Sequence, residues 1–226
     1  MRTVFYEEID AINGQIVTMA GQVERGMSDA TTALLRPDGE LAQAVVSGDR
    51  GIDEQRWAIE SRVVDLIARQ QPVASDLRLL IGALRLASEL ERMGDLASHI
   101  AAAALMRLPD PAVPPGLQDV VAAMGRVANA MALGMREMLA DRTLVTAMDL
   151  DRDDDAMDQL HRQLFARVLG CQPPTPVETA IDVTLIGRYY ERFADHAVTV
   201  SRQVLFVVTG HGPATALPDP RKARSA

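Results

Sequence analysis

The segment Ser88-Glu-Leu-Glu-Arg-Met-Gly-Asp-Leu-Ala-Ser-His-Ile100 has a counterpart one hundred residues later, Arg188-Tyr-Tyr-Glu-Arg-Phe-Ala-Asp-His-Ala-Val-Thr-Val200. The two segments align without a gap, and both contain the pattern Glu-Arg-x-x-Asp-x-Ala. Apolar residues recur at spacings of three and four in each copy, a pattern typical of an amphipathic helix. The repeat therefore predicts an internally duplicated chain.

Proline positions predict where the helices of this chain break. A proline inside a helix costs about 3 kcal/mol, so long proline-free segments rich in Ala, Leu, Arg, Met and Glu are expected to be helical. No stretch shows the alternating, β-branched pattern of strands. We therefore predict an all-α fold. The proline-free segments are 1–36, 38–71, 73–108, 116–172 and 177–212.

The densest proline cluster lies near the middle of the chain and predicts its domain organisation. We expect a first half at residues 1–108, a Pro-rich linker at 109–116 and a second half at 117–209. From residue 210 to 226, Gly, Pro, small and basic residues predict a flexible tail.

Composition excludes several classes of protein. The 226 residues carry a net charge of −8 and a single cysteine, Cys171. One thiol forms neither an internal disulfide nor a thiolate metal site. The net acidity argues against a nucleic-acid-binding protein, which needs a basic face. No apolar run is long enough for a signal peptide or a membrane span, so we expect a cytoplasmic protein without direct membrane insertion.

Four pairs of acidic residues, each with a spacing of four, are the candidate functional residues. Residues four apart lie one turn apart on the same helix face, so each pair presents two carboxylates side by side. Each half carries two such pairs on two different segments. The pairs are Asp49 with Asp53, Glu91 with Asp95, Asp154 with Asp158, and Glu191 with Asp195.

The acidic pairs predict a metal site. If the helix of Asp49 and Asp53 packs antiparallel against the helix of Glu91 and Asp95, four carboxylates converge, and a hard cation would neutralise them. The alternative is that the acids form an ordinary solvated face with surface ion pairs. The occurrence of two pairs in each of two duplicated halves favours the metal site. The adjacent Arg92 and Arg192 would orient the carboxylates, contact phosphate, or form surface ion pairs.

Three strings in this sequence resemble the PhoU family, the accessory proteins of bacterial phosphate uptake. They are Ile67-Ala-Arg-Gln-Gln-Pro-Val-Ala-Ser-Asp-Leu-Arg78, Glu91-Arg-Met-Gly-Asp95 and Tyr190-Glu-Arg-Phe-Ala-Asp-His196. The resemblance covers roughly residues 3–209 and implies two similar three-helix bundles. It also implies that the four acidic pairs bind metal ions, in some members as multinuclear iron or zinc clusters. Together with the oxygen donors, this predicts a divalent or trivalent metal ion (Mg, Mn, Fe or Zn).

The resemblance implies a regulatory function and no catalytic residues. Family members are thought to connect the ATPase of the phosphate ABC transporter to a sensor histidine kinase, and so to repress phosphate-starvation signalling. A homodimer is also expected. Two alternatives stay open, a metal-dependent hydrolase built on the carboxylates and a metal-free helical scaffold.

Two further residues bear on the site. The second half has His196 where the first half has Leu96, so a ligand there would make the two sites unequal. However, a spacing of five turns His196 about 140° away from Glu191 on a helix, which argues against that role. Trp57, the only tryptophan, is expected to be a core residue or a dimer contact.

Overall fold

The computed structural model describes residues 2–141, 147–170 and 176–210. Over these ranges it contains α-helices and one short 3-10 helix (η1, Pro115–Leu117) but no strand, which confirms the all-α prediction. The predicted tail beyond Gly210 and Cys171 lie outside the described residues. The helices are α1 (Arg2–Leu35), α2 (Gly39–Gln70), α3 (Ala74–Arg107), α4 (Gln118–Asp141), α5 (Ala147–Gly170) and α6 (Val177–Thr209).

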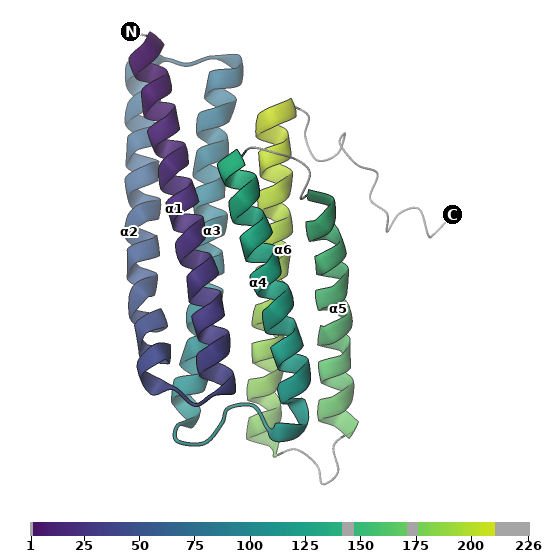
Figure 1. The fold of residues 1–226 in the computed structure, drawn as a ribbon. Helices are drawn as coiled ribbons and strands as arrows, with labels where there is room; N and C mark the ends of the chain where they lie inside the picture. Colours follow the sequence, from purple (N-terminus) through teal and green to yellow (C-terminus); the bar gives the residue numbers. More distant parts are fainter. Residues whose placement is uncertain (1, 142–146, 171–175, 211–226) are drawn as a thin grey trace, which may run out of the picture.

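The helices form two three-helix bundles that lie side by side (Figure 1). Helices α1, α2 and α3 pack against one another in the first bundle, and α4, α5 and α6 do so in the second. Contacts of α1 with α4 and of α3 with α6 join the bundles along their length. The division of the chain into two domains at residues 109–116 stays a prediction.

Local sequence signals explain where α2 begins and ends. Asp38 caps α2, since its side chain accepts a hydrogen bond from the backbone N–H of Leu41 at 3.0 Å. The helix ends at Gln71, whose φ of 45° is left-handed and whose N–H donates to the carbonyl of Ile67. Pro72 follows at once, so the helix breaks where the proline predicts.

The proline-free segment 116–172 contains two helices rather than one. Helix α4 ends at Asp141 and α5 begins at Ala147, although no proline separates them. A single helix over this segment would be roughly 85 Å long and would extend far beyond α1 and α3. Folding back buries the apolar faces of both helices, and this tertiary effect overrides the proline pattern.

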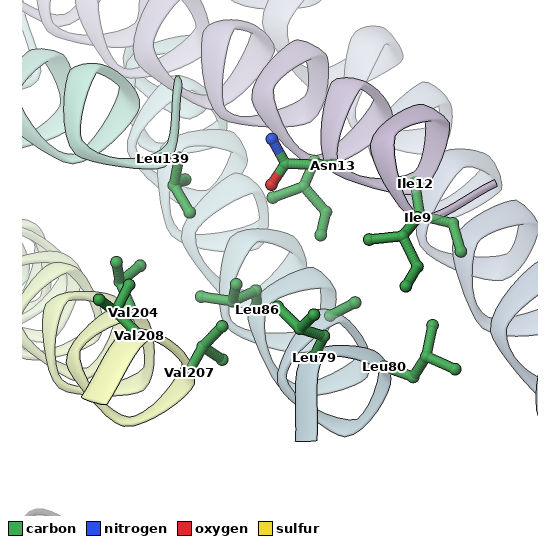
Figure 2. A pocket seen from close by; sticks show the side chains of 12 residues that line it. Ile9, Ile12, Asn13, Leu79, Leu80, Leu86, Leu139, Val204, Val207 and Val208 are labelled. Carbon is green, nitrogen blue, oxygen red and sulfur yellow. The ribbon is translucent and has the colours of Figure 1, made fainter. Parts of the chain in front are cut away.

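The two bundles share one hydrophobic core, which leaves a small apolar hollow at their junction. The hollow has a volume of about 50 Å³, less than two water molecules occupy in the liquid. Figure 2 shows apolar side chains around it from α1, α3 and α6, with Leu139 of α4 and the polar Asn13 of α1. A hollow of this size reflects imperfect packing between the halves and is too small for a ligand.

Candidate metal centre

Helices α2 and α3 bring the four acids of the first half within electrostatic reach of one another. The pKa of Asp49 is raised to about 6, first by burial and then by the charges of Asp95 and Asp53. A hydrogen bond with Ser98 and the nearby His99 act in the opposite direction. The carboxyl of Asp49, on α2, is thus influenced directly by a carboxyl on α3.

Glu91 is the second acid of this cluster whose ionisation is disfavoured. Burial raises its pKa, and the charges of Asp95 and Asp53 add to the effect. Two arginines oppose it: Arg92 Nε lies 3.6 Å and Arg56 Nε 3.9 Å from carboxylate oxygens of Glu91. Arg92 also lies 3.8 Å from Asp95, so it bridges the pair on α3 as a partial counter-charge.

Gly94 allows the two helices to approach at this point. A Cβ at Gly94 would lie 2.8 Å from Cδ1 of Ile52 and 3.2 Å from Oδ1 of Asp49. Any larger residue would therefore push the Asp49 carboxyl away from α3. The second half has Ala194 at the corresponding position, which the hundred-residue repeat identifies.

The acids of the second half are arranged around a histidine. Burial lowers the pKa of His161, on α5, while the charges of Glu191 and Asp158 oppose the shift. Glu191 also pairs with Arg188, and Asp158 lies 3.8 Å from Arg162. Asp154 and Asp195 lie on the same two helices, and the side chain of Asp195 is exposed. The structure therefore brings Asp158 and Glu191 to one place.

The donor set fits a hard cation in its chemistry, but the side chains do not form a ready ligand shell. Over the ranges given above, no group of three or more His, Cys, Asp or Glu side chains is placed to hold a metal ion. Metal binding at these acids stays a prediction, and it requires the carboxylates to rotate inwards.

Sequence patterns did not identify two residues that face these acids. Arg56 and His161 occupy corresponding positions, 105 residues apart, in α2 and α5. Arg56 Nε and His161 Nε2 are both buried without a hydrogen-bond partner. The sequence contains a signal that could have identified them, because the same offset of 105 residues relates Asp53 to Asp158. The acidic cluster of the first bundle therefore faces a guanidinium, and that of the second bundle faces an imidazole.

The other residues considered from sequence lie elsewhere. His196 pairs with Glu89 of α3, with 2.6 Å between Nδ1 and Oε2, so it lies at the junction of the bundles. Trp57 is 61% exposed and therefore is not a core residue. The guanidinium of Arg56 lies 4.9 Å from the centre of its ring, a cation–π contact that links the tryptophan to the acidic cluster.

The raised pKa of Asp49 predicts how stability depends on pH without metal. The folded protein binds this proton more tightly than the unfolded chain, so the free energy of unfolding should fall as pH rises from about 4 to 6. In EDTA, Asp49→Asn should flatten this part of the profile and raise the melting temperature at pH 7.5. Asp65→Asn on the same helix, in an exposed ion pair with Arg69, serves as control. An unchanged profile in Asp49→Asn would contradict the assignment.

Comparison with known proteins places this architecture in a family. The family model described as the PhoU domain matches residues 16–104 and again residues 121–204. Helices α1–α3 thus contain one copy and α4–α6 the other. The chain belongs to the PhoU family.

Relatives within the PhoU family match over nearly the whole chain. "Phosphate-specific transport system accessory protein PhoU homolog 1" of Mycobacterium leprae is 38% identical over 213 residues, which cover 94% of this chain and 96% of the relative. PhoU of Escherichia coli K12 is 30% identical over 210 residues, 91% of this chain and 86% of the relative. The crystal structure of PhoU from Pseudomonas aeruginosa superposes with a TM-score of 0.85 at 28% identity, over 92% and 100% of the two chains.

The PhoU resemblance of the sequence and its two-bundle fold are therefore confirmed. None of the helices in the described ranges combines the length and hydropathy that a bilayer-spanning segment needs. These relatives are named as accessory proteins of the phosphate-specific transport system.

Proposed function

We propose that this chain regulates phosphate uptake and phosphate-starvation signalling as a metal-binding adaptor. In this proposal it connects the ATPase of a phosphate ABC transporter to a sensor histidine kinase in the cytoplasm, and it represses signalling when phosphate is plentiful. The observation that carries the proposal is the match of both bundles to the PhoU domain. Relatives named as accessory proteins of the phosphate-specific transport system support it.

In the proposed mechanism, metal binding at the carboxylate clusters controls how closely the helices approach. Without a cation, the charges of Asp95 and Asp53 repel the charge of Asp49 at the α2–α3 contact, and this repulsion adds to the burial that raises the pKa of Asp49. A divalent or trivalent cation such as Mg, Mn, Fe or Zn would supply the missing positive charge. Neutralised carboxylates then allow α2 and α3 to lie closer, and Glu191 with Asp158 would do the same for α5 and α6. The surface that results is the one that the partners recognise.

The shape of the molecule suits an adaptor. Each bundle consists of helices of 24 to 34 residues, and each of these helices has exposed residues along its length. Two exposed arginines, Arg92 on α3 and Arg192 on α6, lie beside the acidic pairs. A homodimer would present the same faces twice.

The double variant Glu191→Ala/Asp195→Ala tests the proposal. It should lower the metal content of the purified protein and derepress a phosphate-starvation reporter in cells grown with ample phosphate, because two of the four proposed ligands in the second bundle are lost. Metal content is measured by plasma mass spectrometry. The variant Arg152→Ala/Asp149→Ala, which removes an exposed ion pair on α5, is the control.

The outcome separates the proposed function from its alternatives. If the double variant keeps its metal and still represses the reporter, the metal-dependent mechanism is wrong. If the wild-type protein contains no metal but represses, the protein is a metal-free scaffold. Hydrolysis of phosphoesters that depends on added Mn²⁺ would instead indicate a metal-dependent hydrolase.

A further inference from the structure

A cavity of about 230 Å³ lies between α1 and α2 and ends against Gly94 and Ala97 of α3. It holds the volume of about eight water molecules. Asp49 forms part of its wall, so the cavity borders the carboxylate cluster, but it opens between α1 and α2 rather than between α2 and α3. Its polar lining includes Gln22, Asp29 and Asp49, and its apolar lining includes Val23, Val45 and Ile52.

The second bundle shows that packing could have filled this cavity. Buried positions of α1 recur in α4 after 105 residues, as Met19 and Met124 or Met27 and Ala132 illustrate. By this register Gly26 corresponds to Met131, which is fully buried. A Cβ at Gly26 would come no closer than 3.9 Å to another side chain. The cavity therefore exists because a glycine stands where the other bundle has a core methionine.

Two of the three polar groups of the cavity, Gln22 and Asp29, are confined to the first bundle, whereas Asp49 corresponds to Asp154. The same register relates Gln22 to Val127 and Asp29 to Gly134, so the second bundle has neither an amide nor a carboxyl there. Gln22 Oε1 is buried and has no hydrogen-bond partner. A buried acceptor without a donor destabilises the fold, and a donor on a ligand would remove that cost.

The lining selects the chemistry of the ligand. Gln22, Asp29 and Asp49 all offer acceptor oxygens, and two of them can be anionic. Arg25 also belongs to the lining, but its guanidinium extends back along α1 towards Gly21. Its Nη1 lies 3.8 Å from the position that a Cβ on Gly21 would occupy. An inorganic anion would meet carboxylates, and a bare metal ion would meet the apolar walls and too few oxygens. A donor-rich cation on an aliphatic body fits both kinds of wall.

We propose that this cavity binds a small aliphatic molecule carrying an ammonium group. The ammonium donates to Gln22 Oε1 and to the carboxyls of Asp29 and Asp49, while the aliphatic part lies against Val23, Val45 and Ile52. The site goes beyond the proposed regulatory function and does not require a bound metal. It would give the first bundle a ligand that the second bundle cannot take.

Calorimetric titration of the full-length protein in EDTA tests this site with three probes of equal length. Hexylammonium should bind at least tenfold more tightly than hexan-1-ol, and hexanoate should not bind measurably, because only the ammonium supplies several donors and a positive charge. Equal binding of hexylammonium and hexan-1-ol would show a non-specific apolar hollow and would overturn the proposal, as would no binding of hexylammonium.

Two variants assign the binding to this cavity. Gly26→Met inserts the side chain of the second bundle and should weaken hexylammonium binding at least tenfold. Gly14→Met on the same helix, where a Cβ would meet no atom within 4 Å, should leave it within twofold. Gln22→Val should reduce the preference of the protein for hexylammonium over hexan-1-ol. If circular dichroism shows that Gly26→Met does not fold, Gln22→Val becomes the deciding variant. Unchanged binding in Gly26→Met, or an unchanged preference in Gln22→Val, would overturn the proposal.

A metal-site variant separates this proposal from the regulatory one. Glu91→Gln/Asp95→Asn removes two proposed metal ligands but no cavity residue. It should still bind hexylammonium in EDTA within threefold of the wild type. Loss of binding in this variant would place the ligand at the carboxylate cluster and overturn the cavity assignment.

Discussion

Gly125→Ala is expected to lower the free energy of unfolding by about 2 kcal/mol, although alanine is the better helix former. Gly125 lies on α4 where it meets α1, and a Cβ there would lie 2.3 Å from Cγ2 of Thr31. Thr31 cannot move freely, because its Oγ1 hydrogen-bonds to the Tyr190 hydroxyl at 2.9 Å and donates to the Met27 carbonyl. The added methyl therefore displaces α4 from α1 or breaks a buried hydrogen bond. Urea denaturation measures the change.

A second substitution and a matched control identify the cause of this loss. Thr31→Ser removes Cγ2 and keeps the hydroxyl, so the double variant Gly125→Ala/Thr31→Ser should recover more than half of the lost stability. Gly14→Ala on α1, where a Cβ meets nothing within 4 Å, should stabilise the protein by about 0.5 to 1 kcal/mol. If Gly125→Ala proves as favourable as Gly14→Ala, the close approach of α1 and α4 is not essential.

The fold was largely predictable because its signals are local. Pro37, Pro72 and Pro176 stand in the turns that precede α2, α3 and α6, and the repeat at Ser88–Ile100 marks the third helix of each bundle. The break between α4 and α5 lacks such a signal. It depends on the length of the neighbouring helices, a property of the packed molecule that no short stretch of sequence contains.

The candidate site was predictable only in part, for a related reason. The spacing of Glu91 and Asp95 fixes their common face on a helix, and the structure brings the charges of Asp49 and Asp53 within reach of them across the α2–α3 contact. Which cations face these acids depends on packing, so Arg56 and His161 were not identified. The cavity at Gly26 was not predicted either, because a single glycine gives no sign of it until α1 and α4 are compared.

Glu91→Gln/Asp95→Asn is expected to change stability in opposite directions with and without metal. In EDTA the variant should be more stable than the wild type by about 0.5 kcal/mol, because it removes two like charges that lie one helical turn apart. Burial and the charge of Asp95 raise the pKa of Glu91, so its ionised form is already disfavoured. The amides keep the shape of the side chains, so packing is unchanged. Thermal unfolding in EDTA and in Mn²⁺ measures both effects.

With Mn²⁺ the order should reverse. The wild type should gain about 2.7 kcal/mol at a metal concentration one hundred times its dissociation constant, whereas the variant, which keeps only Asp49 and Asp53 at this site, should gain almost nothing there. The corresponding variant Glu191→Gln/Asp195→Asn reports on the second bundle alone. Acids that merely form a solvated face would make the double amide variant neutral in both conditions. Only a cluster that is retained for binding a cation explains a substitution that stabilises the empty protein and abolishes its response to metal.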